Sequence, residues 1–119
     1  MSTLKTALAA ATLSLTVAST QVLAETQTRT IEYQVGDETF TGYMAWDDEF
    51  GQKRPGVLVV HEWWGHNEFA RNQAERLALA GYTAFALDMY GSGKQADHPD
   101  TAQKFMQEAT RDMSQVKAR

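Results

Sequence analysis

The chain has 119 residues, a formal net charge of −4 and no cysteine. The length allows one domain at most, and the mild acidity excludes the basic surface that nucleic acid binding requires. The lack of cysteine excludes a disulfide framework, a thiol nucleophile and thiolate metal ligands within these residues.

Residues 1–24 follow the plan of a secretory signal peptide. A short segment with one lysine precedes an apolar stretch over residues 7–17, and Val22-Leu23-Ala24 offers small residues at a cleavage site. The stretch is too short and too polar to span a membrane. We expect cleavage near Ala24, a mature chain that begins at Glu25 without a membrane span, and a periplasmic or secreted location.

Two segments of alternating polarity predict a β-hairpin in the mature chain. They cover residues 28–35 and 39–46, and Gly36-Asp37-Glu38 is the expected turn between them. Gly42 interrupts the second segment and predicts either a β-bulge or a close approach of another group. Residues 47–54 are charged and predict a loop.

Residues 56–89 predict a βαβ unit. Val57–Val60 is a continuous apolar run, which is typical of a parallel strand buried on both faces. Asn67 is the expected N-cap of the helix that follows, and Gly81 is the glycine expected to end it. Residues 83–89 then predict the second parallel strand.

The C-terminal part predicts a loop and one further helix. Residues 90–94 are rich in glycine, and Asp100 is suited to cap a helix over residues 101–117. The apolar residues of this helix form one stripe, which we assign to core packing: Ala102, Phe105, Met106, Ala109, Met113 and Val116.

The candidate site is the cluster that follows the first strand of the βαβ unit, where parallel sheets collect their ligands. It reads His61-Glu62-Trp63-Trp64-Gly65-His66. A carboxylate such as Glu62 is costly to bury beside apolar bulk, so its position favours a perturbed pKa and a functional role. The two tryptophans have the simpler interpretation of a packed aromatic shelf.

Other catalytic motifs fit the sequence poorly. A zinc protease motif needs two histidines four apart on a helix, whereas His61 and His66 are five apart, so a zinc site on His61, Glu62 and His66 is the least favoured alternative. Gly91-Ser92-Gly93-Lys94 lacks the first glycine and the final Ser/Thr of a P-loop. No Gly-x-Ser-x-Gly elbow occurs. The histidines, including His98, are suited to act as bases, although such residues are more often surface groups.

Four motifs occur in a fixed order along the chain. Val59-Val60-His61-Glu62-Trp63-Trp64-Gly65 precedes Ala80-Gly81-Tyr82, Leu87-Asp88-Met89-Tyr90-Gly91 and Ala96-Asp97-His98-Pro99. This set resembles the N-terminal part of the dienelactone hydrolase family. The resemblance implies an α/β fold over residues 25–119, the incomplete N-terminal half of an α/β-hydrolase. It also implies a hydrolase that cleaves ester or lactone bonds of small molecules by nucleophilic acyl transfer, without cofactor or metal, and the signal peptide plan adds that this hydrolase is exported.

The resemblance assigns roles to single residues. Glu62 would contact the family's cysteine nucleophile, and Trp63 would donate its backbone N–H to the oxyanion hole, which makes both expected catalytic residues. Trp64, Tyr90 and Ser92 are the expected substrate-binding residues. Ser92 stands where the dienelactone-cleaving members carry an arginine for the substrate carboxylate, which argues against that lactone substrate and leaves the ester class open.

The resemblance places the family's nucleophile and the rest of its triad beyond Arg119, so we expect a fragment that is inactive by itself. In the family's strand order the third strand lies between the fourth and the fifth. Residues 57–60 would therefore form an open edge that invites self-association. The alternative is a non-catalytic exported α/β binding or assembly module whose open edge is covered by a partner.

Overall fold

A computed structural model describes residues 25–48 and 53–119. The expected signal peptide at residues 1–24 and part of the loop expected at residues 47–54 lie outside the described residues. The elements are β1 (Thr26–Val35), β2 (Glu38–Asp47), β3 (Gly56–Val60), α1 (Glu68–Leu79), β4 (Thr83–Leu87), α2 (Pro99–Thr110) and α3 (Met113–Ala118). No helix in this described part combines the length and the hydropathy that a membrane crossing requires.

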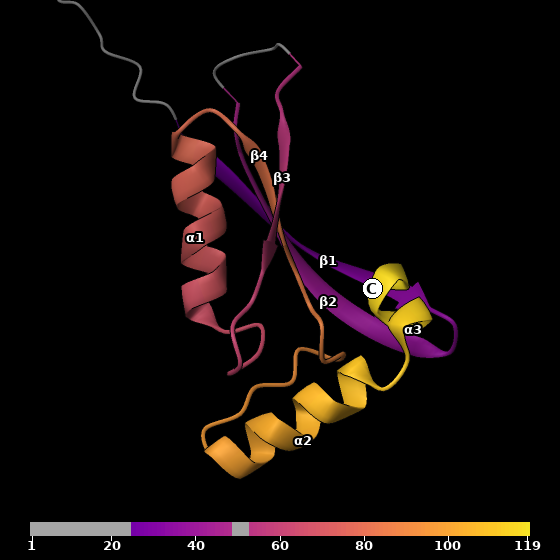
Figure 1. The fold of residues 1–119 in the computed structure, drawn as a ribbon. Coiled ribbons are helices and arrows are strands. Elements are labelled where there is room, and N and C mark those ends of the chain that lie inside the picture. The colour runs from indigo at the N-terminus through magenta and orange to yellow at the C-terminus, as the bar shows by residue number, and fades with distance from the viewer. Residues whose placement is uncertain (1–24, 49–52) are drawn as a thin grey trace, which may run out of the picture.

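The four strands form one sheet in the order β1-β2-β4-β3 (Figure 1). β1 and β2 pair along their whole length as the expected hairpin, and Val35 pairs with Glu38, so that the turn is Gly36-Asp37 and the expected third turn residue begins β2. Gly42 keeps the ladder unbroken. A Cβ at Gly42 would overlap the ring of Phe85, so of the two expected alternatives the structure shows the close approach.

The βαβ unit is confirmed. β3 pairs parallel with β4, and α1 connects them. Asn67 caps α1, because its side-chain oxygen accepts the Ala70 N–H at 3.3 Å. Gly81 ends α1 with a φ of 92°, and the N–H groups of Gly81 and Tyr82 donate to helix carbonyls in the pattern of a Schellman motif.

The core lies between α1 and the sheet and consists of small side chains. Its buried members are Ala45, Ala70, Ala74, Ala78, Ala84 and Ala86. Alanine on both surfaces allows the helix to approach the strands closely, and Figure 1 shows α1 running alongside β3 and β4. This packing fixes the direction in which both strands end, and therefore where the loops after them meet.

The expectation that β3 is buried on both faces is wrong for the described structure. Val57 and Val59 are half-buried, but Leu58 is 68% exposed and Val60 is 61% exposed. The reason is that α1 covers one face of the sheet, while the opposite face bears a hollow of about 470 Å³ beside α3. β3 is also an edge strand of the described sheet, as the resemblance implied.

The single C-terminal helix expected over residues 101–117 is two helices. α2 begins at Pro99 after His98, so Asp100 lies in its first turn and is not its cap. The helix breaks before Asp112, whose carboxylate accepts the Ser114 N–H at 2.8 Å and caps α3. The expected stripe is divided accordingly: Ala102 and Ala109 are buried, whereas Met113 is 63% exposed.

Candidate active site

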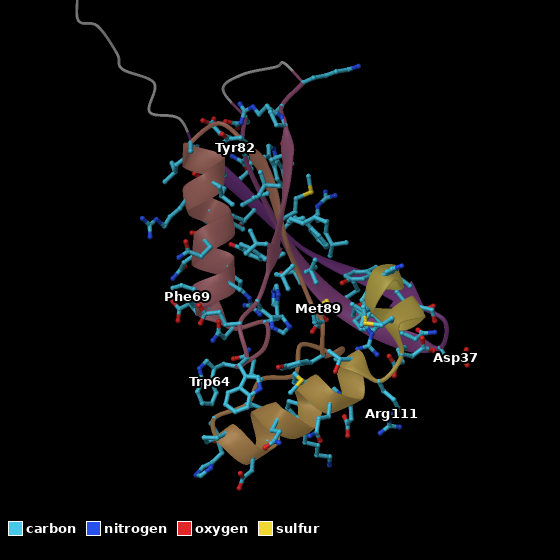
Figure 2. All side chains as sticks on the ribbon, in the orientation of Figure 1. Asp37, Trp64, Phe69, Tyr82, Met89 and Arg111 are labelled. Atoms are coloured by element: carbon cyan, nitrogen blue, oxygen red, sulfur yellow. The ribbon has the colours of Figure 1, made fainter. Side chains whose placement is uncertain are left out.

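The site lies where β3 and β4 end next to each other. Val60 pairs with Leu87 in the last register of the parallel ladder, so the residues after both strands enter one loop region. Figure 2 shows Trp64, on the loop after β3, at the same end of the sheet as Met89, and α2 crosses this end in Figure 1. A cavity of about 240 Å³ lies here, lined by His61, Glu62, Trp63, Met89, Tyr90, Met106, Ala109 and Thr110.

The loop after β3 is a tight turn joined to the loop after β4. The Gly65 N–H donates to the Glu62 carbonyl at 3.2 Å, which closes the turn. Gly65 has a φ of 96°, and a Cβ there would overlap the carbonyl oxygen of Lys94, so only glycine fits. The Ala96 N–H donates to the Trp64 carbonyl at 2.9 Å and ties the two loops together.

Asp88 organises the loop after β4. Its side chain is fully buried. One carboxylate oxygen accepts the N–H groups of Tyr90 at 3.1 Å and Gly91 at 3.0 Å, and the other accepts those of Thr41 at 3.2 Å and Gly93 at 2.8 Å. Asp88 therefore holds the loop in shape and lies outside the cavity lining.

Two side chains fix the backbone on the cavity wall. His61 lies with Nδ1 2.7 Å from the Glu62 carbonyl oxygen, and its Nε2 lies 3.0 Å from the Met89 nitrogen. The Tyr90 hydroxyl donates to the Trp63 carbonyl at 2.8 Å. Burial raises the pKa of Tyr90 above its ordinary value, so the phenol remains a donor at neutral pH.

His66 is fully buried beneath the site. Its Nδ1 lies 3.2 Å from the Leu87 carbonyl oxygen, and its Nε2 has no hydrogen-bond partner. Burial lowers the pKa of His66, because the imidazolium form would lose its hydration. His66 is therefore a neutral residue that links the segment before α1 to the last residue of β4, Leu87.

No group of three or more His, Asp or Glu side chains within residues 25–48 and 53–119 is arranged to hold a metal ion. Both nitrogens of His61 are engaged with the backbone, and His66 is buried. The zinc alternative on His61, Glu62 and His66 therefore receives no support from the geometry.

The structure gathers three of the five expected site residues around the cavity: Glu62, Trp63 and Tyr90. The Glu62 side chain is exposed, so the desolvation cost expected from the sequence does not arise in the described part of the chain. Trp64 packs against Trp63 with ring centroids 5.7 Å apart and is not part of the lining. Ser92 faces a separate hollow and donates its N–H to the Thr39 carbonyl at 2.8 Å.

Sequence reasoning missed the contribution of α2 and the role of His61. Met106, Ala109 and Thr110 form a wall of the cavity, whereas the sequence pattern predicts core packing for the stripe that contains Met106 and Ala109. The spacing of the stripe cannot distinguish a wall from a core, since both require apolar residues on one helix face. The sequence suggests only a base or a metal ligand at His61, and it carries no signal for the contact of His61 with Met89.

A hairpin followed by a βαβ unit, with a cavity at the carboxyl ends of the parallel strands, is an α/β arrangement with its candidate site where open α/β sheets bind ligands. The model of the dienelactone hydrolase family matches residues 40–119, and the chain belongs to this family.

The relatives extend beyond the part matched here. Protein usf of Aquifex pyrophilus is 42% identical over 79 residues, which cover 64% of this chain and 32% of that protein. A putative carboxymethylenebutenolidase of Aquifex aeolicus (strain VF5) is 41% identical over 81 residues, covering 66% and 33%. The solved structure of m3DLH shares a TM-score of 0.71 and 35% identity over 78% of this chain and 40% of that chain. The chain thus spans about a third of the length of the curated relatives it matches.

Proposed function

We propose that this chain is the N-terminal part of an exported hydrolase that cleaves ester or lactone bonds of small molecules by nucleophilic acyl transfer. The carboxymethylenebutenolidase relative supports the substrate class, since that name denotes a lactone-cleaving enzyme. Two of the roles inferred from the family resemblance belong to residues at the cavity, Glu62 and Trp63.

The observation that carries the proposal is the free N–H group of Trp63. It has no hydrogen-bond partner among residues 25–48 and 53–119, although the neighbouring carbonyls of Glu62 and Trp63 are both engaged. A fixed backbone donor beside a cavity is what an oxyanion hole requires, because it stabilises negative charge in the transition state without having to reorganise.

Glu62 is the second catalytic residue of the proposal. Its carboxylate is exposed at the cavity and makes no hydrogen bond within the described part of the chain, so it is available to a nucleophile supplied from outside this part. A carboxylate next to a thiol controls the protonation and the orientation of that thiol. Tyr90 would border the substrate. Trp64 would act only through its packing against Trp63, and Ser92, which faces a separate hollow, would meet only a substrate that extends beyond the cavity.

The test removes the Trp63 N–H group from the protein expressed from its complete gene. Trp63→Pro lacks the N–H group, and loss of one oxyanion donor typically lowers kcat by about 10²–10³-fold. Trp63→Phe keeps both the N–H and an aromatic ring and serves as the matched control. Hydrolysis of p-nitrophenyl acetate and of a small lactone is the assay, with circular dichroism to verify that both variants fold.

A folded Trp63→Pro variant that retains ester turnover within about threefold of wild type would exclude Trp63 as the oxyanion donor. Export has a separate test, N-terminal sequencing of the protein recovered from the cell envelope fraction. Glu25 as the first residue supports export, and an intact Met1 contradicts it.

A further inference from the structure

The turn after β3 is held by donors that engage two successive carbonyl groups. The Glu62 carbonyl lies 2.7 Å from Nδ1 of His61 and also accepts the Gly65 N–H at 3.2 Å. The next carbonyl, that of Trp63, accepts the Tyr90 hydroxyl at 2.8 Å. The peptide units on both sides of the Trp63 α-carbon are therefore fixed in orientation.

Fixing a carbonyl also fixes the N–H of the same peptide unit. The peptide bond is planar and trans, so the C=O of Glu62 and the N–H of Trp63 point in opposite directions from one rigid plane. His61 holds that carbonyl on one side of the C–N bond. The N–H of Trp63, which has no partner in the described residues, is thereby directed to the other side.

The partners of His61 define its protonation pattern. A backbone N–H can only donate, so Nε2 of His61 accepts from Met89 and carries no proton. A carbonyl oxygen can only accept, so Nδ1 carries the proton and donates it to Glu62. His61 is thus a neutral imidazole with its proton on Nδ1, and it bridges the end of β3 to the end of β4.

The ring of His61 is also held sterically. It is 9% exposed and makes an edge contact with the Tyr90 ring, with centroids 4.7 Å apart. Tyr90 is the residue that holds the Trp63 carbonyl. The side chains of His61 and Tyr90 therefore support each other. Through these contacts, Met89 and Tyr90 after β4 set the orientation of the turn after β3.

We propose that His61, as the Nδ1–H tautomer, is a positioning residue that aims the Trp63 N–H at the reacting oxygen. This inference rests on the proposed acyl-transfer function. His61 itself exchanges no proton with the substrate in this role, because both of its ring nitrogens are engaged with the backbone.

Three substitutions separate the two hydrogen bonds of His61. His61→Asn places an amide N–H near Nδ1 and retains the donor to Glu62. His61→Gln places a carbonyl oxygen near Nε2 and retains only the acceptor for Met89. His61→Phe keeps the ring volume and the contact with Tyr90 but removes both bonds.

We expect His61→Phe and His61→Gln to lower kcat for a p-nitrophenyl ester by about tenfold or more, with KM unchanged, because a misdirected oxyanion donor weakens transition-state binding only. His61→Asn is expected to retain kcat within about threefold. A KM change of the same size as the kcat change, or equal losses in His61→Asn and His61→Phe, would overturn the positioning role.

A second readout is independent of turnover. The ¹⁵N chemical shifts of the His61 ring should show a protonated Nδ1 and an unprotonated Nε2. The amide resonance of Trp63 should move in His61→Phe and stay near its wild-type position in His61→Asn. A protonated Nε2, or a Trp63 amide that responds equally to both variants, contradicts the inference. Absence of ester turnover in the wild type would instead refute the proposed function, and the NMR result would still decide how the Trp63 N–H is held.

Discussion

Asp88 shows how one buried carboxylate replaces regular secondary structure in a loop. Its two oxygens accept four backbone N–H groups, from Thr41, Tyr90, Gly91 and Gly93. A loop that wraps around buried backbone needs such an acceptor, because an unpaired buried N–H costs as much as a lost hydrogen bond. The side chain is thus a stability determinant next to the site.

We predict that Asp88→Asn destabilises the protein. The amide group presents a donor where the carboxylate had an acceptor, so two of the backbone N–H groups lose their partner at a cost of about 1–3 kcal/mol each. Urea unfolding followed by circular dichroism measures the change, and Asp97→Asn, which alters an exposed side chain, is the control. Equal unfolding midpoints for the two variants would show that Asp88 has no such role.

His66 gives the fold a dependence on pH. The pKa of its buried ring is lowered from 6.5, so between the folded and the unfolded pKa the unfolded chain binds more protons than the native one. Stability therefore rises with pH in this window: the contribution is fully present above about pH 6.5 and is lost as the pH falls through the folded pKa.

We predict that the free energy of unfolding decreases when the pH falls from 7 to 5, and that His66→Gln flattens this dependence. The neutral ring leaves Nε2 without a proton, whereas the charged ring would bury a second N–H that has no partner. Urea titrations at several pH values provide the measurement. His98→Gln changes an exposed histidine and should leave the slope with pH unchanged; a slope that persists in His66→Gln would assign the dependence to another group.

At the scale of elements, α1 is the helix that positions the site, because it follows the turn directly and contacts all four strands of the described sheet. Its start depends on Asn67, and its end depends on Gly81 in the left-handed region. Both signals act within a few residues of the chain, which is why they are readable from the sequence.

We predict that Asn67→Ala lowers the stability of the protein by about 0.5–2 kcal/mol, since the cap bond to the Ala70 N–H is lost. Asn72→Ala is the matched control, because Asn72 is exposed within the same helix and alanine there has the higher helix propensity. Thermal unfolding of both variants tests the prediction, which fails if Asn67→Ala is as stable as Asn72→Ala.

At the scale of the whole molecule, the described sheet exposes apolar side chains on the face opposite α1, and its edge strand β3 has no strand beside it within the described residues. Leu58 and Val60 lie on this face of β3, next to the hollow beside α3. An exposed apolar edge strand is a template for pairing with another chain. Both rival functions require cover here, either from further parts of a hydrolase or from a partner of a binding module.

We predict that the 119-residue chain self-associates and that Leu58→Lys weakens the association. Removing a buried leucine from a contact costs about 1.5–3 kcal/mol, which corresponds to roughly tenfold or more in the dissociation constant. Analytical ultracentrifugation over a range of concentrations measures it. Leu79→Lys is the control, because Leu79 is 65% exposed on α1 and away from the open face. A wild-type chain that is monomeric at all concentrations contradicts the prediction.

The sequence by itself determined the elements whose signals are local. The hairpin, the parallel strands, the cap Asn67, the terminating Gly81 and the position of the cluster at the end of β3 follow from periodicity and from contacts a few residues apart. The apolar stripe over residues 101–117 predicts one continuous helix, although Asp112 is a capping residue and the structure begins α3 after it.

Only the tertiary structure decided which distant residues meet. Asp88 accepts the N–H of Thr41, 47 residues away, and Tyr90 donates to Trp63, 27 residues away. His61 reaches Met89 across 28 residues. Such bonds depend on the packing of α1 on the sheet and on the end points of two strands, and no local pattern encodes them. For the same reason the sequence predicted where the site lies, but the hydrogen bonds that hold its backbone in place emerged only from the fold.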